Sequence, residues 1–182
     1  MYTLIWRDVR LLGWRPNEGD KTKVMECNFD TPLSWFVGYS SGYADSIRKE
    51  KNDVVYLKIM AHGYYTSGSG GYGLQFCKED IVLSTLAKLL GLHGKFAAGV
   101  DVLACGAAAI APASGATEGN GAILCRRLAM SLATNVTASD TPQLYGKGTG
   151  PKDGIDFGKW QGNVFTWDKK GILIKKQVFP KD

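Results

Sequence analysis

The sequence predicts one α/β domain in which a mostly parallel sheet carries helices on both faces. Short apolar runs that are typical of buried strands alternate along the chain with segments whose apolar residues recur at helical spacing. The length of 182 residues is that of one ordinary domain, and 45% hydrophobic with 21% charged residues is a globular composition. We therefore expect a single domain over residues 1–182.

The first half of the chain is expected to supply two strands and the helix between them. Residues 1–12 are aromatic and aliphatic enough for a first strand. A helix should start at Thr31 and Pro32, because Thr can cap a helix and Pro fits its first position. Apolar residues then recur at helical spacing as far as the charged turn at 48–51. Residues 54–60 are almost continuously apolar, which is typical of a buried strand.

The second half continues the alternation and ends in a hairpin. Asp80 is expected to cap a helix with leucines on its inner side, and residues 100–104 form another buried strand. The remaining predicted elements are a short strand over 73–77, a helix from Asn120 or Gly121 to Leu132, a short strand over 135–139, and a C-terminal β-hairpin of residues 163–167 and 172–179. In such sheets, functional residues gather at the carboxyl ends of the parallel strands.

Composition and charge limit the cellular locations and the classes of binding partner that we expect. No apolar run approaches the roughly 20 residues of a membrane helix, and charges interrupt the N-terminal segment as they would not in a signal peptide. The net charge is +5, and five lysines fall in the last fifteen residues, as on a solvated strand edge that avoids pairing. We expect no nucleic acid or membrane partner, and a cytoplasmic location or export without a cleaved signal peptide. The oligomeric state is left open.

The cysteines and histidines are too few and too scattered for a metal centre. The four cysteines contain no CxxC pair, and His62 and His93 are the only histidines. A zinc site of the usual spacing cannot be built from them. We expect free thiols in a reducing compartment, and no metal or organic cofactor.

His62 and Cys105 each follow a predicted buried strand, and each precedes a glycine. If the two strands are parallel neighbours, both side chains emerge at one edge of the sheet. There the imidazole can take the proton of the thiol, and the thiolate can act as a nucleophile. A glycine lets another backbone approach closely, and the amides of Gly63 and Cys105 can then face a developing oxyanion. The structural alternatives are a turn histidine and a buried small hydrophobe.

The blocks that carry a family resemblance are Ala61-His62-Gly63, Leu103-Ala104-Cys105-Gly106, the helix from Gly121 to Leu132, and Val136-Thr137-Ala138-Ser139. In this order they resemble the caspase-like (clan CD) cysteine peptidases, nearest to bacterial caspase-like, clostripain–gingipain and autoprocessing-type domains, over about half the chain. The resemblance implies a three-layer sandwich with His62 as acid/base and Cys105 as nucleophile. It also implies an oxyanion hole that involves Gly63. The chain lacks the Gln-Ala-Cys-x-Gly run of true caspases, so a preference for cleavage after Asp is not indicated.

The resemblance further implies a specificity pocket beside the nucleophile strand. Asp101 and Asp140 are the candidate acids for an Arg or Lys side chain of the substrate, and Ser139 belongs to one wall of the cleft. Asp101 equally fits a carboxylate that bonds a neighbouring Arg or amide, because a charge inside a strand needs a partner. Asp140 equally fits a cap of the turn that Pro142 continues.

The expected function is that of a cysteine endopeptidase that cleaves a polypeptide substrate. The candidate cleavage site is after Arg or Lys, and the candidate role is that of a bacterial effector or processing enzyme. One alternative is a caspase-like binding module in which the dyad is silent. Another is a Cys-dependent amide hydrolase that acts on a side-chain amide. The glycine-rich stretch 67–73 is expected at the rim near His62, and residues 107–120 are expected to form a flap.

Overall fold

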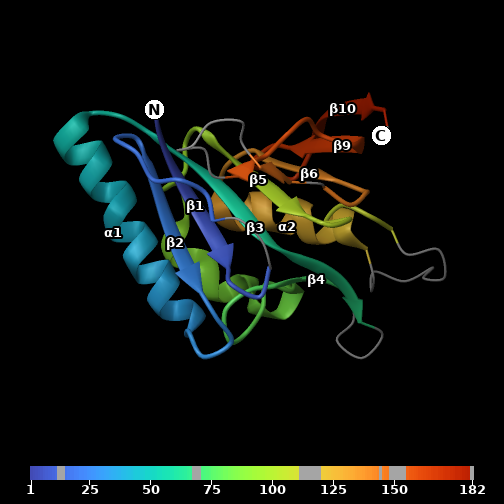
Figure 1. Cartoon of the computed structure of the whole chain (residues 1–182), viewed down its shortest axis with the longest axis horizontal. Helices are drawn as coiled ribbons and strands as arrows, with labels where there is room; N and C mark the ends of the chain where they lie inside the picture. The colour runs from blue at the N-terminus through green and yellow to red at the C-terminus, as the bar shows by residue number, and fades with distance from the viewer. Residues whose placement is uncertain (12–14, 67–70, 111–119, 144, 148–154, 181–182) are drawn as a thin grey trace.

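The computed structural model describes residues 1–11, 15–66, 71–110, 120–143, 145–147 and 155–180 (Figure 1). These residues form one eight-stranded mixed sheet of order β10-β9-β6-β5-β3-β1-β2, with β4 paired to β3 outside this path. The strands are β1 (Tyr2–Asp8), β2 (Thr22–Cys27), β3 (Val55–Thr66), β4 (Gly71–Gln75), β5 (Gly99–Ala104), β6 (Val136–Ser139), β9 (Gly162–Trp167) and β10 (Leu173–Phe179). A separate pair is formed by β7 (Gly146–Lys147) and β8 (Ile155–Asp156). The described helices are α1 (Leu33–Lys51), the 3₁₀ helix η1 (Leu83–Leu92) and α2 (Gly121–Leu132).

The sheet is mostly parallel, as predicted. Strands β2, β1, β3, β5 and β6 run in one direction, whereas β9 is antiparallel to β6 and β10 is antiparallel to β9. The C-terminal hairpin is therefore confirmed, and its lysine-bearing strand β10 lies at the edge of the sheet. Strand β3 is longer than expected: it continues through His62 to Thr66 and forms an antiparallel pair with β4.

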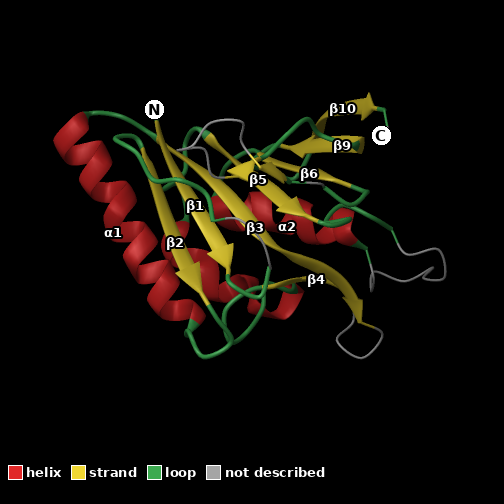
Figure 2. Cartoon of the chain, viewed as in Figure 1, coloured by secondary structure: helices red, strands yellow, loops and turns green. Residues whose placement is uncertain are grey.

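The prediction of helices on both faces, and with it the three-layer sandwich, is wrong for the described residues. Residues of β3 alternate between the two faces, and the face that carries Leu57 and Ile59 forms one continuous core with all three described helices. Figure 2 shows the 3₁₀ helix and α2 behind the strands. The opposite face holds a small cluster of Ile5, Val24, Met60 and Leu103. We call it the open face.

The order of the strands explains why the helices share a face. Helix α1 connects β2 to β3, η1 connects β3 to β5, and α2 connects β5 to β6, so each crossover steps in the same direction across the sheet. Because parallel crossovers are almost always right-handed, steps in one direction place their helices on one face. Only the step from β1 to β2 goes the other way, and its described residues, 9–11 and 15–21, form no helix.

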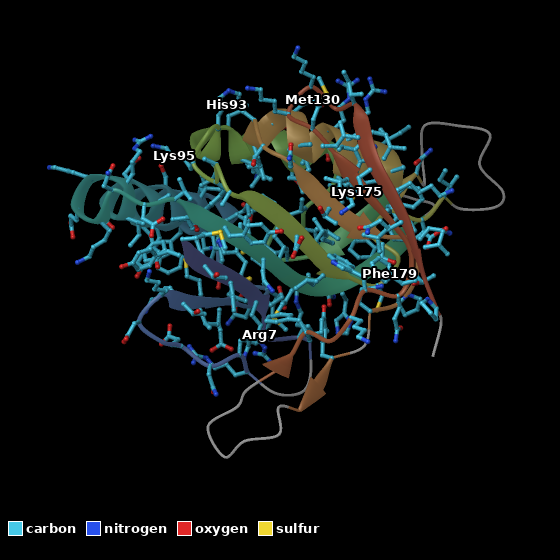
Figure 3. The ribbon with its side chains drawn as sticks, turned by 90° about the horizontal axis from the view of Figure 1, so that it is seen from above. Arg7, His93, Lys95, Met130, Lys175 and Phe179 are labelled. Atoms are coloured by element: carbon cyan, nitrogen blue, oxygen red, sulfur yellow. The ribbon has the colours of Figure 1, made fainter. Side chains whose placement is uncertain are left out.

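The open face is covered by connecting segments. Leu11, Tyr145, Phe157 and Trp160 pack against its apolar cluster. Figure 3 shows the β7–β8 pair on the side of the sheet opposite to the labelled His93 and Met130, which mark the C-terminal ends of η1 and α2. A surface that is covered only by connections leaves room for polar side chains at the ends of its strands.

Two of the three predicted helix starts differ from the structure. Pro32 is the N-cap of α1 and not its first residue, and the Glu79 carboxylate accepts a hydrogen bond from Leu33 N at 2.8 Å. Asp80 does not cap η1, because its carboxylate accepts from Phe76 N at 2.9 Å. Helix α2 begins at Gly121, one of the two predicted starts, and the Asn120 side chain caps it by accepting from Ile123 N.

Candidate active site

Strands β3 and β5 bring His62 and Cys105 to neighbouring positions. The two strands are parallel neighbours, and the last pair in register is Ala61 with Ala104. His62 directly follows Ala61, and Cys105 directly follows Ala104. Strand alternation places His62 on the side of Met60, which is the open face, whereas Cys105 is the first residue of the turn after β5. The two residues thus occupy adjacent positions at one edge of the sheet, although His62 lies inside β3 rather than after it.

Two glycines allow the backbone around Cys105 to pack closely. A Cβ atom at Gly63 would clash with the carbonyl oxygen of Cys105, so only glycine fits beside the candidate nucleophile. Gly106 has a φ of +60°, in the left-handed region that favours glycine, and a Cβ there would lie 2.5 Å from the Tyr72 hydroxyl oxygen. Gly106 N also donates to Thr141 O at 3.0 Å. The turn that follows Cys105 is therefore held on several sides.

The His62 ring is exposed and is oriented by the backbone. Its Nε2 lies 3.1 Å from the carbonyl oxygen of Arg10. When Nε2 carries the proton and donates it to this carbonyl, Nδ1 keeps a free lone pair that can accept a proton from a thiol.

Arg10 is in turn held by a buried carboxylate at the end of β1. The Asp8 oxygens accept from Arg10 Nη2 at 2.6 Å and Nε at 2.8 Å, and Arg10 Nη2 also donates to Cys77 O at 2.8 Å. Burial raises the pKa of Asp8, but the hydrogen bonds and charge of Arg10 outweigh this effect and leave the pKa below its ordinary value. No sequence pattern indicates this pair, because nothing local connects residues 8 and 10 with a histidine 52 positions from Arg10.

Two tyrosines flank the half-buried Cys105. The hydroxyl of Tyr145 donates to Leu103 O, and Tyr145 packs on the open face, where the sequence predicted one wall of the cleft. Tyr72 comes from β4 and lies against Gly106. Burial raises the pKa of both tyrosines, and the charge of Cys105 adds to the increase. Both phenols therefore stay protonated at neutral pH.

Ser139 and Asp140 are engaged by the junction of β6 with β9. The Ser139 side chain is buried, donates to Gln161 O and accepts from Thr141 N at 3.2 Å. The Asp140 carboxylate accepts from Asn163 N at 2.9 Å and from Asn163 Nδ2 at 2.7 Å. Its partner is therefore a residue of β9 and not the turn at Pro142.

Asp101 lies within β5 on the open face, four residues before Cys105 in the chain. Its carboxylate accepts from the Tyr56 hydroxyl at 2.7 Å. Burial raises the pKa of Asp101, against the opposing effects of that hydroxyl and of the Lys58 charge. A cavity of about 60 Å³ opens here, lined by Lys58, Asp101, Leu103, Gln143, Phe157, Gly158 and Trp160.

Comparison with protein-family models gave no match, and neither did comparison with curated proteins or with solved structures. In the described part of the chain, no group of three or more His, Cys, Asp or Glu side chains is placed to hold a metal ion. The described helices are too short or too polar to cross a membrane. Residues 67–70 of the predicted rim and 111–119 of the predicted flap lie outside the described residues.

Proposed function

We propose that this chain is a cysteine peptidase of the caspase-like type, with Cys105 as nucleophile and His62 as acid/base. The observation that supports the proposal best is the register of β3 with β5, because its last pair, Ala61 with Ala104, immediately precedes His62 and Cys105. The contact of His62 Nε2 with the Arg10 carbonyl adds support, because it leaves Nδ1 as the proton acceptor.

The proposed reaction follows from these positions. His62 Nδ1 takes the proton of the Cys105 thiol, and the thiolate attacks the carbonyl carbon of a peptide bond. The amides of Gly63 and Cys105 stabilise the oxyanion of the tetrahedral intermediate. The imidazolium of His62 then protonates the leaving amine, and a thioester forms. Water, deprotonated by His62, hydrolyses the thioester and restores the thiol.

For the substrate we propose a polypeptide that is cleaved after Arg or Lys. Of the two candidate acids, Asp101 supports this choice better, because both oxygens of Asp140 are already bonded to Asn163. Asp101 lines a cavity on the open face together with Leu103, which is two residues before Cys105 in the chain. Asp101→Asn should therefore weaken cleavage after basic residues. Ser139 and Asp140 should contribute by shaping one wall of the substrate cleft.

A peptide-library cleavage assay tests the proposal. The variants are Cys105→Ala and His62→Ala, and His93→Ala is the matched control, because His93 is also exposed and also contacts a backbone carbonyl, Ser131 O, at 3.1 Å. We expect cleaved peptides from wild type and His93→Ala, and a loss of about 10²-fold or more in the other two.

Product analysis separates the other two functions. Released ammonia with an intact polypeptide would indicate a side-chain amide hydrolase. Neither product, with all variants folded, would contradict the proposal and indicate a binding module.

A further inference from the structure

Two buried cysteines from distant parts of the chain meet at one carboxylate. Cys27 ends β2, and Cys77 follows β4 after one intervening residue. Cys27 Sγ lies 3.6 Å from Asp8 Oδ2, and Cys77 N donates to the same oxygen at 3.0 Å. Both side chains belong to the helix-side core. The shared oxygen therefore fixes the two cysteines next to each other.

The Cys77 thiol also affects the protonation of the Cys27 thiol. The pKa of the Cys27 thiol is raised above its ordinary value, first by a hydrogen bond with the Cys77 thiol and then by burial. A disulfide requires the two sulfur atoms to reach the bonded distance of about 2.05 Å, which residues held at one carboxylate can do without a large rearrangement of the chain. Cys125 is held elsewhere, where its thiol donates to Ala107 O at 3.4 Å.

We propose that Cys27 and Cys77 form a disulfide when the chain folds in an oxidising medium, with a small disulfide such as oxidised glutathione as the oxidant. One cysteine thiolate attacks a sulfur of oxidised glutathione and releases one glutathione thiolate. The second cysteine thiolate attacks the mixed disulfide and releases the other. The two cysteine protons end on the released thiolates, so two electrons pass to glutathione and one new S–S bond forms.

Burial sets when this reaction takes place. In the folded, reduced protein both side chains are at most 2% exposed, so a small disulfide does not reach them without local opening. The raised pKa of Cys27 also keeps its thiolate rare. The bond therefore closes during folding, as a structural disulfide. It ties the end of β2 to the segment after β4, beside the Asp8–Arg10 pair, and it requires no catalytic activity of the chain.

Oxidative refolding of the whole chain tests the proposal. The protein is unfolded and reduced, refolded in a buffer of reduced and oxidised glutathione, then denatured, alkylated with iodoacetamide and digested with trypsin. We expect peptide 24–48 joined to peptide 59–78 with the loss of two hydrogens, and Cys105 and Cys125 alkylated in peptide 96–126. Alkylation of Cys27 and Cys77 to the same extent as Cys125, or a bridge that involves Cys105, would overturn the proposal.

Thermal unfolding supplies a second readout. Closing a chain segment of 50 positions restricts the unfolded state, so the refolded, oxidised wild type should melt several degrees above the reduced form. Cys27→Ser with Cys77→Ser should lose this difference, whereas Cys125→Ala, which removes another buried thiol, should keep it. An oxidised wild type that melts no higher than the reduced form would contradict a structural disulfide at this position.

Discussion

The two faces of the central sheet are built for different tasks. The helix-covered face is one continuous apolar core that includes Trp6, Phe36, Phe76 and Phe96, all fully buried. The apolar cluster of the open face has four buried residues, and polar side chains such as Lys58, His62 and Asp101 lie on the same face. Stability therefore comes mainly from one face, and the chemistry that we propose lies on the other.

One carboxylate on each face shows the difference most clearly. Asp8 follows Leu4 and Trp6 on the helix side of β1, and the partners from Arg10 and Cys77 lower its pKa despite burial. Asp101 lies on the open side of β5, and burial raises its pKa. The paired charge of Asp8 stabilises the folded state. The raised pKa of Asp101 makes this acid a candidate for a functional role.

The largest expected effect is on the helix-covered face. Phe36→Ala should lower the free energy of unfolding by about 3–5 kcal/mol, because it removes a fully buried ring that packs edge-on against Trp6 and Phe76. Trp35→Ala, one residue earlier in α1, is the control: its side chain is 55% exposed, so the change should stay within about 0.5 kcal/mol. Denaturant unfolding compares the two, and equal losses would refute a core concentrated on this face.

The next effect concerns the close approach at the site. Gly63→Ala should cost about 1–3 kcal/mol and displace Cys105, because the new methyl group meets the Cys105 carbonyl. Gly42→Ala in α1 meets nothing within 4 Å and should instead stabilise the protein by about 0.5–1 kcal/mol. Urea unfolding together with the rate of Cys105 alkylation measures both effects. If Gly63→Ala matched Gly42→Ala in both, the two strands would not meet as described.

The smallest effect is a difference in pH dependence. The lowered pKa of Asp8 gives stability that is present above the unfolded value of about 3.9 and is lost as the pH falls through the folded pKa. The raised pKa of Asp101 has the opposite sign: its contribution is present below the unfolded value and is lost as the pH rises through the folded pKa.

Unfolding free energies between about pH 2 and 7 separate the two acids. Asp8→Asn should flatten the loss of stability in acid, and Asp101→Asn should steepen it. The same direction of change in both variants would show that the two faces do not treat their carboxylates differently.

The sequence predicted those elements whose signal is local. The apolar runs around Leu57 and Val102 identify strands because both strands are buried in the sheet. Strand β2 was missed, since its six residues include two lysine or glutamate side chains and show no continuous apolar run. The extension of β3 beyond His62 was also missed, because it depends on pairing with β4.

The arrangement in space was harder to predict. The face on which each helix packs follows from the order of the strands, which no local pattern encodes. His62 and Cys105 were predicted because each follows an apolar segment and precedes a glycine. The Arg10 carbonyl, which contacts His62, and the Tyr72 ring, which lies against Gly106, come from other segments of the chain. No sequence pattern indicates these contacts.

The most direct test of the His62–Cys105 pair is site-resolved alkylation by iodoacetamide between about pH 5 and 9, a range that brackets free and activated thiols. Wild type, His62→Ala and the control His93→Ala are compared peptide by peptide. We predict that Cys105 reacts quickly in the acidic half of this range in wild type and His93→Ala, and slowly in His62→Ala. Equal rates in all three proteins, rising only near the value of about 8.5 for a free thiol, would contradict the pair.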